Sequence, residues 1–233
     1  MFHKKKSLIS GEVNCRRVYV MNPSIDFSRC HQAHVPTGNL FCPSSHTLPA
    51  MAFDPAQVYE PEADTYLLLN EASLEVRPGD LVLEIGTGSG KIAASLSVPA
   101  LVVATEINPH AASCAHAKGV EVIRTDLMAG LRGMFDLILF NPPYLPTRPD
   151  ERIDDWLEYA LDGGESGRRL IERFAAEAGY VLKPGGRMLL LISSLTGLAE
   201  VCEVFNRHGY LVNVAREQIV EDEILYVLRI IPR

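Results

Sequence analysis

The sequence predicts an α/β protein built on a doubly wound, mostly parallel sheet with an antiparallel hairpin at its C-terminal end. From Met51 onward, short apolar runs alternate with helical patterns, which is typical of parallel strands joined by helices. Acidic or glycine-rich turns follow several of these runs, as at the ligand-binding edge of such a sheet. The last two apolar runs are joined by a charged stretch, which favours a hairpin.

Seven strands are expected, five in the body of the chain and two in its tail. They are Leu81–Ile85, Leu101–Thr105, Val120–Ile123, Phe135–Phe140, Arg187–Ser193, Tyr210–Ala215 and Ile224–Ile230. Helices are expected at Thr65–Ser73, Pro109–Lys118, Gly167–Leu182 and Thr196–His208. Pro109 suits a first helical turn, and Gly209 is a helix stop.

The composition is that of one compact domain, with 233 residues, 47% hydrophobic residues, 22% charged residues and a net charge of −7. No run approaches the roughly 20 apolar residues of a membrane span. Five cysteines without a signal peptide indicate a reducing cytosol, so we expect a cytoplasmic protein.

A boundary is expected near Met51. Residues 1–50 hold six Lys or Arg and two acidic residues, a net charge of +4, whereas residues 51–233 hold 16 basic and 27 acidic residues, a net charge of −11. Residues 1–50 show no sustained periodicity, so we expect an irregular or disordered extension before a functional start at Met51. Residues 51–233 are expected to be the catalytic domain.

One alternative gives the extension a zinc site. Cys30-x-x-x-His34 and Cys42-x-x-x-His46 are four candidate ligands. The loop between the pairs is short, and no apolar residues are spaced to pack a finger around a metal. We therefore expect no metal site.

A glycine loop, Glu84-Ile85-Gly86-Thr87-Gly88-Ser89-Gly90-Lys91, follows the first strand. A dinucleotide fingerprint would need glycine at Lys91, and a P-loop would need glycine at Ile85 and Ser or Thr at Ile92. Both phosphate interpretations fail. Glu84 before the glycines suits a ligand with a cationic or amine-bearing end, and a glycine turn of structural purpose is the alternative.

Two further acidic positions close the next two strands. Glu106 stands 22 residues after Glu84, where a carboxylate in a doubly wound fold bridges two ribose hydroxyls. Asp126 and Leu127 put a carboxylate beside a backbone N–H, a pair that can read the amino group and ring nitrogen of adenine. A solvated loop end is the alternative for each carboxylate.

The fourth strand ends in Asn141-Pro142-Pro143-Tyr144. Two consecutive prolines donate no ladder hydrogen bonds, so the strand must end there and the turn is stiff. The Asn141 carboxamide oxygen and the Pro142 carbonyl could accept the two hydrogens of a planar NH₂ group, and Tyr144 offers a face for stacking. The alternative is a purely structural turn.

These motifs resemble those of the class I S-adenosylmethionine-dependent methyltransferases that carry Asn-Pro-Pro-Tyr, a group with a Rossmann-like fold. The resemblance rests on Val82–Gly90, Glu106, Asp126 and Asn141–Tyr144, with Leu182–Gly186 before the fifth strand. Tyr59-Glu60-Pro61-Glu62-Ala63-Asp64-Thr65 is further similar to the HemK-like release-factor glutamine methyltransferases of the archaeal and eukaryotic branch. There is one departure: the family usually reads Tyr-Glu-Pro-Ala-Glu-Asp, whereas here Glu62 precedes Ala63, so the order of Ala and Glu is inverted.

The resemblance implies S-adenosylmethionine as cofactor. The residues implied to contact it are Thr65, Glu84, Gly86, Gly88, Glu106, Asp126, Leu127 and Asn141. The residues implied to hold the acceptor amide are Asn141, Pro142, Pro143 and Tyr144. It also implies a partner, a small zinc-containing activator protein that adds to the sheet edge.

The acceptor is expected to be the Gly-Gly-Gln glutamine of a translation termination factor, methylated at N5. A catalytic part at −11 lacks the basic footprint of nucleic-acid binding, which favours a protein acceptor. Asp162-Gly163-Gly164-x-x-Gly167-Arg168 also resembles the acceptor-side segment of these enzymes, its alternative being a loop that caps the next helix. The remaining alternatives are adenine-N6 or other methylation of RNA or DNA, and a non-catalytic binding module.

Overall fold

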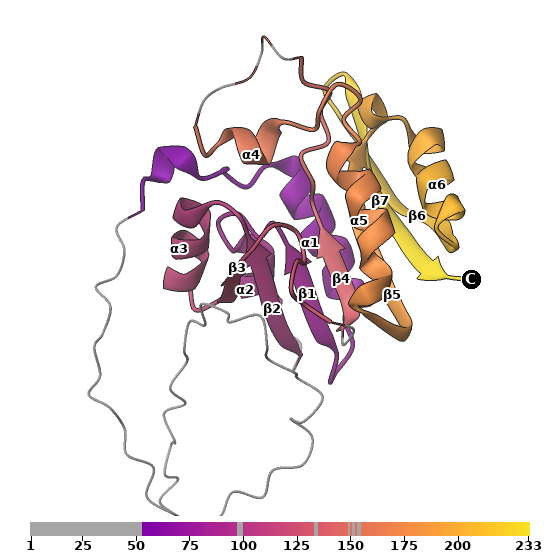
Figure 1. Cartoon of the computed structure of the whole chain (residues 1–233), viewed down its shortest axis with the longest axis horizontal. Coiled ribbons are helices and arrows are strands. Elements are labelled where there is room, and N and C mark those ends of the chain that lie inside the picture. Colours follow the sequence, from indigo (N-terminus) through magenta and orange to yellow (C-terminus); the bar gives the residue numbers. More distant parts are fainter. Residues whose placement is uncertain (1–52, 97–99, 133–134, 149, 151, 153–154) are drawn as a thin grey trace, which may run out of the picture.

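The computed structural model describes residues 53–96, 100–132, 135–148, 150, 152 and 155–233 (Figure 1). The extension expected over residues 1–50, with its zinc alternative, lies outside the described residues. Within them, no helix is both long and apolar enough to cross a membrane.

Seven strands form one sheet in the described part of the chain, in the order β3-β2-β1-β4-β5-β7-β6. The strands are β1 (Leu81–Ile85), β2 (Leu101–Glu106), β3 (Glu121–Arg124), β4 (Phe135–Phe140), β5 (Leu182–Ser193), β6 (Tyr210–Val220) and β7 (Glu223–Pro232). Strands β1 to β5 are parallel, and β7 and β6 complete the sheet as an antiparallel hairpin. This confirms the predicted fold class.

Helices cover both faces of the sheet. They are α1 (Ala63–Glu75), α2 (Lys91–Ser95), α3 (Pro109–Ala117), α4 (Glu158–Leu161), α5 (Arg169–Glu177) and α6 (Leu198–Arg207). Leu67 and Leu68 of α1 pack on one face, and α5 and α6 pack on the other. Alternate residues of the inner strands therefore enter different cores, and these strands are apolar throughout.

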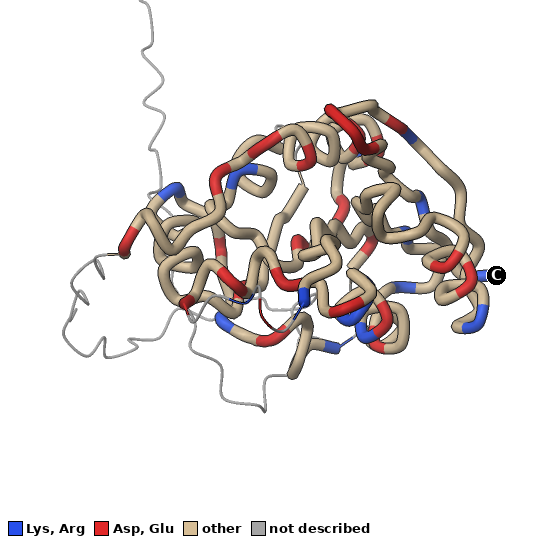
Figure 2. Tube along the Cα trace, turned by 90° about the horizontal axis from the view of Figure 1, so that it is seen from above, with Lys and Arg blue, Asp and Glu red and all other residues tan. Residues whose placement is uncertain are grey.

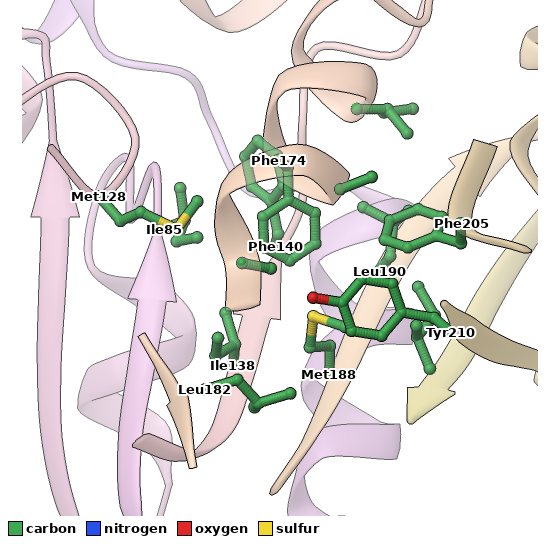
Figure 3. Close-up of a cluster of buried hydrophobic side chains, with 14 of the residues drawn as sticks. Ile85, Met128, Ile138, Phe140, Phe174, Leu182, Met188, Leu190, Phe205 and Tyr210 are labelled. Carbon is green, nitrogen blue, oxygen red and sulfur yellow. The ribbon is translucent and has the colours of Figure 1, made fainter. Parts of the chain in front are cut away.

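The core beneath α5 and α6 contains a row of aromatic rings (Figure 3). Phe140, Phe174, Phe205 and Tyr210 meet edge to face in succession, with ring centroids 5.2, 5.9 and 6.0 Å apart. Phe140 is 2% exposed and is the last residue of β4. This packing fixes the point from which Asn-Pro-Pro-Tyr leaves the sheet.

The predicted helix over Gly167–Leu182 is too long. Helix α5 ends at Glu177, a 3-10 turn covers Ala178–Tyr180, and Leu182 already pairs with Phe135 in the sheet. The apolar stripe continues past the helix because Ala178 in this turn and Val181 after it are also buried, so periodicity alone did not mark the end. For the same reason β5 begins five residues before the predicted Arg187, with a register shift opposite Phe135–Leu137.

Candidate active site

A cavity of about 360 Å³ opens at the carboxyl ends of β1 and β4. Strands β2 and β3 lie on one side of β1 and β4 lies on the other, so the strand order reverses here, where doubly wound sheets bind ligands. All the predicted site residues line this one cavity: Thr65, Glu84, Gly86, Gly88, Glu106, Asp126, Leu127, Asn141, Pro142, Pro143 and Tyr144.

The glycine loop is held by Glu84 from beneath. Glu84 is 4% exposed, and its Oε2 accepts hydrogen bonds from the Thr87 hydroxyl at 2.8 Å and the Ala93 N–H at 2.9 Å. Burial raises the pKa of Glu84 to about 8, against the lowering effect of these two bonds. Gly86 and Gly88 have φ of +61° and +55°, a region that glycine adopts without strain. One carboxylate oxygen thus fixes the loop that forms the floor of the cavity.

Glu106 closes β2 and is also buried. Its Oε2 accepts from the Gly88 N–H, and its Oε1 accepts from the Ile107 and Asn108 N–H groups, all at 2.8 Å. Burial raises the pKa of Glu106, while these three bonds oppose the rise. The carboxylate therefore links the glycine loop to the turn after β2. Oε1 already accepts two bonds, whereas Oε2 accepts one and keeps a lone pair for a ligand.

Asp126 and Leu127 follow β3 at the cavity rim. Asp126 forms an ion pair with Arg173 of α5, with 3.0 Å between Oδ2 and Nη2, and both side chains are about half exposed. Leu127 is buried with φ of +48°, which costs a non-glycine residue about 1–2 kcal/mol. The structure thus adds Arg173 to Asp126 and Leu127. Its helix was predicted, but the sequence did not show that this helix brings Arg173 to the segment after β3.

Helix α4 lines the cavity, and the residues before it are bonded to the N-terminal part of the described chain and to the turn after β2. Trp156 donates its N–H to Gln57 Oε1 at 2.9 Å, and Asn108 Nδ2 donates to the backbone carbonyls of Gln57 and Trp156 at 2.7 and 3.3 Å. The ring of Trp156 stacks on Tyr159, which also lines the cavity. Figure 1 shows the 3-10 turn Pro55–Gln57 beside α4, although the two segments are about 100 residues apart in the sequence.

Asn141 leaves β4 with its carboxamide in a defined orientation. Its Nδ2 donates to Asp64 Oδ2 at 3.0 Å. Its Oδ1 is buried and, among the described residues, has no hydrogen-bond partner. A buried acceptor without a donor is costly, by about 1–3 kcal/mol, unless a ligand supplies the donor. The orphaned oxygen lies in the wall of the cavity, which indicates an N–H or O–H donor as the ligand group.

The rest of the tetrapeptide packs against residues 162–168, the segment that resembles the acceptor-side part of the release-factor enzymes. A Cβ built on Gly167 would lie 2.3 Å from the Tyr144 carbonyl oxygen, and one on Gly163 would lie 2.8 Å from that of Pro143. Thr196, fully buried, donates its hydroxyl to the Tyr144 carbonyl at 3.0 Å. The glycines are therefore required for close backbone approach, and the segment supports the turn rather than only capping α5.

Sequence reasoning missed two positions in this site. Asp64 was noted in its motif but received no role, yet it is 4% exposed and contacts both ends of the tetrapeptide. Arg173 carried no motif at all. The acidic residue at the start of a helix beside a family motif was a usable signal for Asp64, whereas only the packing of α5 reveals Arg173.

The order of these parts along the sheet edge defines a class of enzyme, the class I methyltransferases, and solved structures of that class share the fold. The Mtq2–Trm112 complex of E. cuniculi, described as responsible for methylation of the translation termination factor eRF1, contains a chain that aligns with a TM-score of 0.65 and 27% identity. The alignment covers 76% of this chain and 99% of that chain. A scan against protein-family models finds no match.

Sequence relatives define the family. A protein of Methanocaldococcus jannaschii, provisionally named a protein N5-glutamine methyltransferase, is 41% identical over 180 residues, which are 74% of this chain and 90% of that protein. Methyltransferase HEMK2 of Mus musculus is 35% identical over 189 residues, 74% of this chain and 88% of that protein. The chain belongs to the family of HemK-like protein N5-glutamine methyltransferases.

Proposed function

We propose that this chain transfers the methyl group of S-adenosylmethionine to N5 of the glutamine in the Gly-Gly-Gln motif of a translation termination factor. The observation that carries the proposal is the buried, unpartnered Oδ1 of Asn141 in the cavity wall. A primary amide supplies the N–H donor that this oxygen lacks. The relatives' names and the eRF1-methylating complex support the choice of a glutamine in a termination factor.

The cavity residues fit S-adenosylmethionine. The cavity volume of about 360 Å³ is in the range of small-molecule sites. A Cβ on Gly88 would meet no atom within 4 Å, so the loop leaves open space above its backbone. Glu106 and Asp126 would hold the ribose and adenine, and Thr65, Glu84, Gly86 and Leu127 would complete the wall. When bound, the cofactor supplies an electrophilic methyl group on a sulfonium.

The protein's contribution is orientation. An amide nitrogen is a weak nucleophile because its lone pair is delocalised into the carbonyl. Asn141 Oδ1 and the Pro142 carbonyl would accept its two hydrogens and aim the lone pair, while Tyr144 would stack on the amide plane. Orientation supplies roughly 7–11 kcal/mol in well-aligned cases. Buried Pro142 and Pro143 keep this arrangement rigid and exclude water.

Substitutions of Asn141 and Glu106 should separate chemistry from cofactor binding. We expect Asn141→Ala to lower kcat by at least about 1,000-fold with little change in the S-adenosylmethionine Kd, since the acceptor amide loses the oxygen that orients it. We expect Glu106→Ala to weaken that Kd about 10-fold or more, because Gly88 loses its anchor. Calorimetry and single-turnover kinetics measure the two effects. Retained turnover in Asn141→Ala contradicts the assignment.

The acceptor is tested by labelled-methyl transfer to three substrates in parallel. These are a purified termination factor, its Gly-Gly-Gln→Gly-Gly-Ala variant, and total RNA. We expect label in the first alone. Label in RNA would favour adenine methylation instead, and label in both protein samples would place the acceptor outside Gly-Gly-Gln.

The proposal extends to a partner, a small zinc-containing activator protein at a sheet edge. The solved structure of the similar Mtq2 chain is a complex with Trm112, which supports it. Strand β3 is one free edge of the sheet among the described residues, and the nearby Leu101 is 62% exposed. Such an edge presents unpaired backbone groups to which another chain can add.

A further inference from the structure

We infer that Asp64 is a positioning residue, which fixes the carboxamide of Asn141 and the ring of Tyr144 in the orientation that receives the acceptor amide. The inference rests on the proposed function for the identity of the acceptor, and on the contacts of Asp64 alone for the positioning.

Asp64 is the point where three elements meet. It lies in the first turn of α1, it is 4% exposed, and it lines the cavity. Its Oδ2 accepts from Asn141 Nδ2 at 3.0 Å, from the Tyr59 hydroxyl at 3.2 Å and from the Tyr144 hydroxyl at 3.4 Å. Its Oδ1 accepts from the hydroxyl of Thr65 at 3.2 Å. A single carboxylate thus holds both ends of the Asn-Pro-Pro-Tyr turn.

A carboxylate at this place determines which way the Asn141 amide faces. Carboxylate oxygens only accept hydrogen bonds, so the amide must present Nδ2 to Asp64. A flipped amide would oppose two acceptor oxygens about 3 Å apart. The Asn141 oxygen is consequently directed to the cavity, where it has no partner among the described residues. A carboxamide or a hydroxyl at position 64 would not impose this choice, because either can also donate.

The two phenols strengthen the same arrangement. Burial, followed by the charge of Asp64, raises the pKa of Tyr59 and of Tyr144, so both hydroxyls keep their protons and act as donors. Position 64 is also at a helix N-terminus, where negative charge is favourable. The groups that donate to Asp64 therefore all belong to this protein, and the arrangement needs no contribution from the acceptor.

The first test uses Asp64→Asn, which keeps the shape of the side chain and lets the amide of Asn141 turn over. We expect kcat to fall about 100-fold, as for a small misplacement at a reacting centre, with the S-adenosylmethionine Kd within threefold. The matched control is Glu62→Gln, because Glu62 is exposed and, among the described residues, its side chain accepts a hydrogen bond from Tyr59 alone, at 3.5 Å. We expect kcat of the control within twofold of wild type.

The second test reads the contact in the wild-type protein, with no acceptor and no variant of Asp64. The Asn141 side-chain amide protons, assigned by their loss in Asn141→Ala, should exchange with solvent at least 10-fold more slowly than those of exposed Asn70. Unprotected Asn141 protons overturn the inference. It is also overturned if Asp64→Asn loses no more kcat than Glu62→Gln, or if the kcat loss of Asp64→Asn is matched by a loss of cofactor binding. Failure of wild-type protein to methylate any termination factor would refute the proposed function alone, since the exchange measurement needs no acceptor.

Discussion

The carboxylate of Glu84 has a structural role that its place in the motif did not reveal. From its spacing, the acid was expected to suit the amine-bearing end of a ligand. In the structure, its Oε2 accepts hydrogen bonds from Thr87 of its own loop and from Ala93 of α2. A role toward the ligand stays a prediction, and a role in the architecture of the loop is added to it.

The raised pKa of Glu84 predicts a pH dependence of stability. The folded-state pKa of about 8 lies above the ordinary value of 4.5, so between these values the folded protein keeps a proton that the unfolded chain releases. This group therefore contributes full stability below pH 4.5, and its contribution falls by about 1.4 kcal/mol per pH unit up to pH 8. Denaturant unfolding of the ligand-free protein measures it.

The control for this prediction is Glu84→Gln, which cannot titrate and should show a flatter stability profile between pH 5 and pH 8. Glu217→Gln, at an exposed position on β6, should follow the wild-type profile. Identical slopes in the wild type and in Glu84→Gln would show that Glu84 is ionised in the folded protein.

At the scale of elements, the Asn-Pro-Pro-Tyr turn is supported by neighbours that are distant in sequence. Gly167 has φ of +69°, and its backbone lies against the Tyr144 carbonyl. Arg168 donates from Nη1 to the carbonyl of Thr196, and the Thr196 hydroxyl reaches the same Tyr144 carbonyl. The loop before α5 and the turn after β5 therefore set the height of the tetrapeptide above the sheet.

Gly167→Ala should lower kcat about 10-fold or more while leaving the S-adenosylmethionine Kd nearly unchanged. The added Cβ would stand 2.3 Å from the Tyr144 oxygen, so the turn must shift. The control is Gly185→Ala, with a similar φ of +77° but no atom within 4 Å of its Cβ, which should lose stability without losing kcat. Steady-state kinetics and thermal unfolding compare the two. Equal kcat in both variants would remove the support role.

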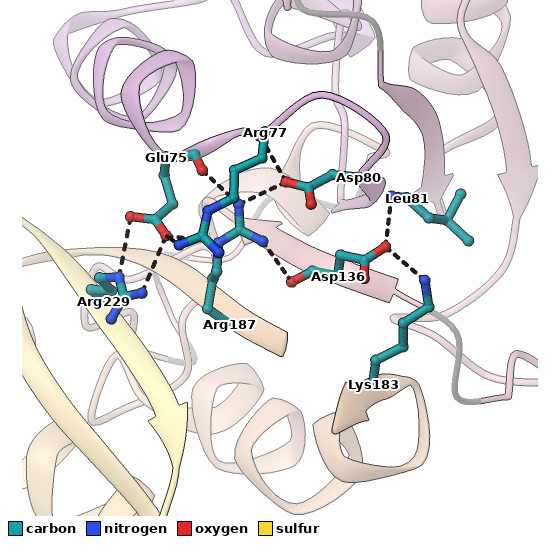
Figure 4. Close-up of polar contacts among 8 residues, drawn as sticks. All are labelled: Glu75, Arg77, Asp80, Leu81, Asp136, Lys183, Arg187 and Arg229. Atoms are coloured by element: carbon teal, nitrogen blue, oxygen red, sulfur yellow. Dashed lines mark hydrogen bonds and ion pairs between the residues drawn. The ribbon is translucent and has the colours of Figure 1, made fainter. Parts of the chain in front are cut away.

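At the amino ends of β1 and β4, opposite the cavity, one buried guanidinium connects several elements (Figure 4). Arg187 of β5 is 3% exposed and pairs with Glu75 at the end of α1 and with Asp80 before β1, both at 2.7 Å. It also donates to the Asp136 carbonyl, and Arg229 of β7 joins at Glu75. The network connects four elements far from the cavity.

Arg187→Ala should lower the free energy of unfolding by about 3–5 kcal/mol, because largely buried Asp80 loses its ion pair and Glu75 loses one of its arginine partners. Arg77→Ala is the matched control, since Arg77 is 65% exposed and lies 4.0 Å from the same Glu75, and its effect should stay below about 1 kcal/mol. Urea unfolding measures both. Similar losses of unfolding free energy in the two variants would contradict the claim that the buried ion pairs of Arg187 stabilise the fold more than the exposed contact of Arg77.

At the scale of the whole molecule, acidic segments are spread over the described trace seen from above, with fewer basic ones between them (Figure 2). This agrees with the −11 of residues 51–233. Such a surface repels nucleic acid backbones, and it suits a protein acceptor. The sheet ends in β3 on one side and in β6 on the other, so among the described residues both edges are open to another chain.

Co-expression with a small zinc-containing activator should therefore raise the yield and the methyltransferase activity of this chain. An added strand would pair the free backbone groups of a sheet edge and cover apolar surface. Chromatography of the co-expressed pair, with activity per mole of the chain, measures the effect. A fully active monomer with unchanged activity beside the activator would remove the need for a partner.

Local patterns in the sequence were enough to predict the fold class and the end of the strands at which the site forms. Alternating apolar runs define buried parallel strands because such strands must be covered on both faces, and polar motifs at strand ends then share one edge. The predicted strands over 81–85 and 135–140 match β1 and β4 residue for residue. The Asn-Pro-Pro-Tyr motif was readable because proline constrains the backbone locally.

How the site residues are held could not be predicted, because it depends on contacts between distant parts of the chain. The bonds from Asp64 to Asn141 and from Arg173 to Asp126 join residues 77 and 47 positions apart. No local pattern encodes such contacts, since they arise when α1 and α5 pack on opposite faces of the sheet. The end of α5 was missed for a related reason, because Ala178 and Val181 are buried by neighbouring elements although the α-helix has already ended. Local motifs supplied the chemistry, and long-range packing supplied its orientation.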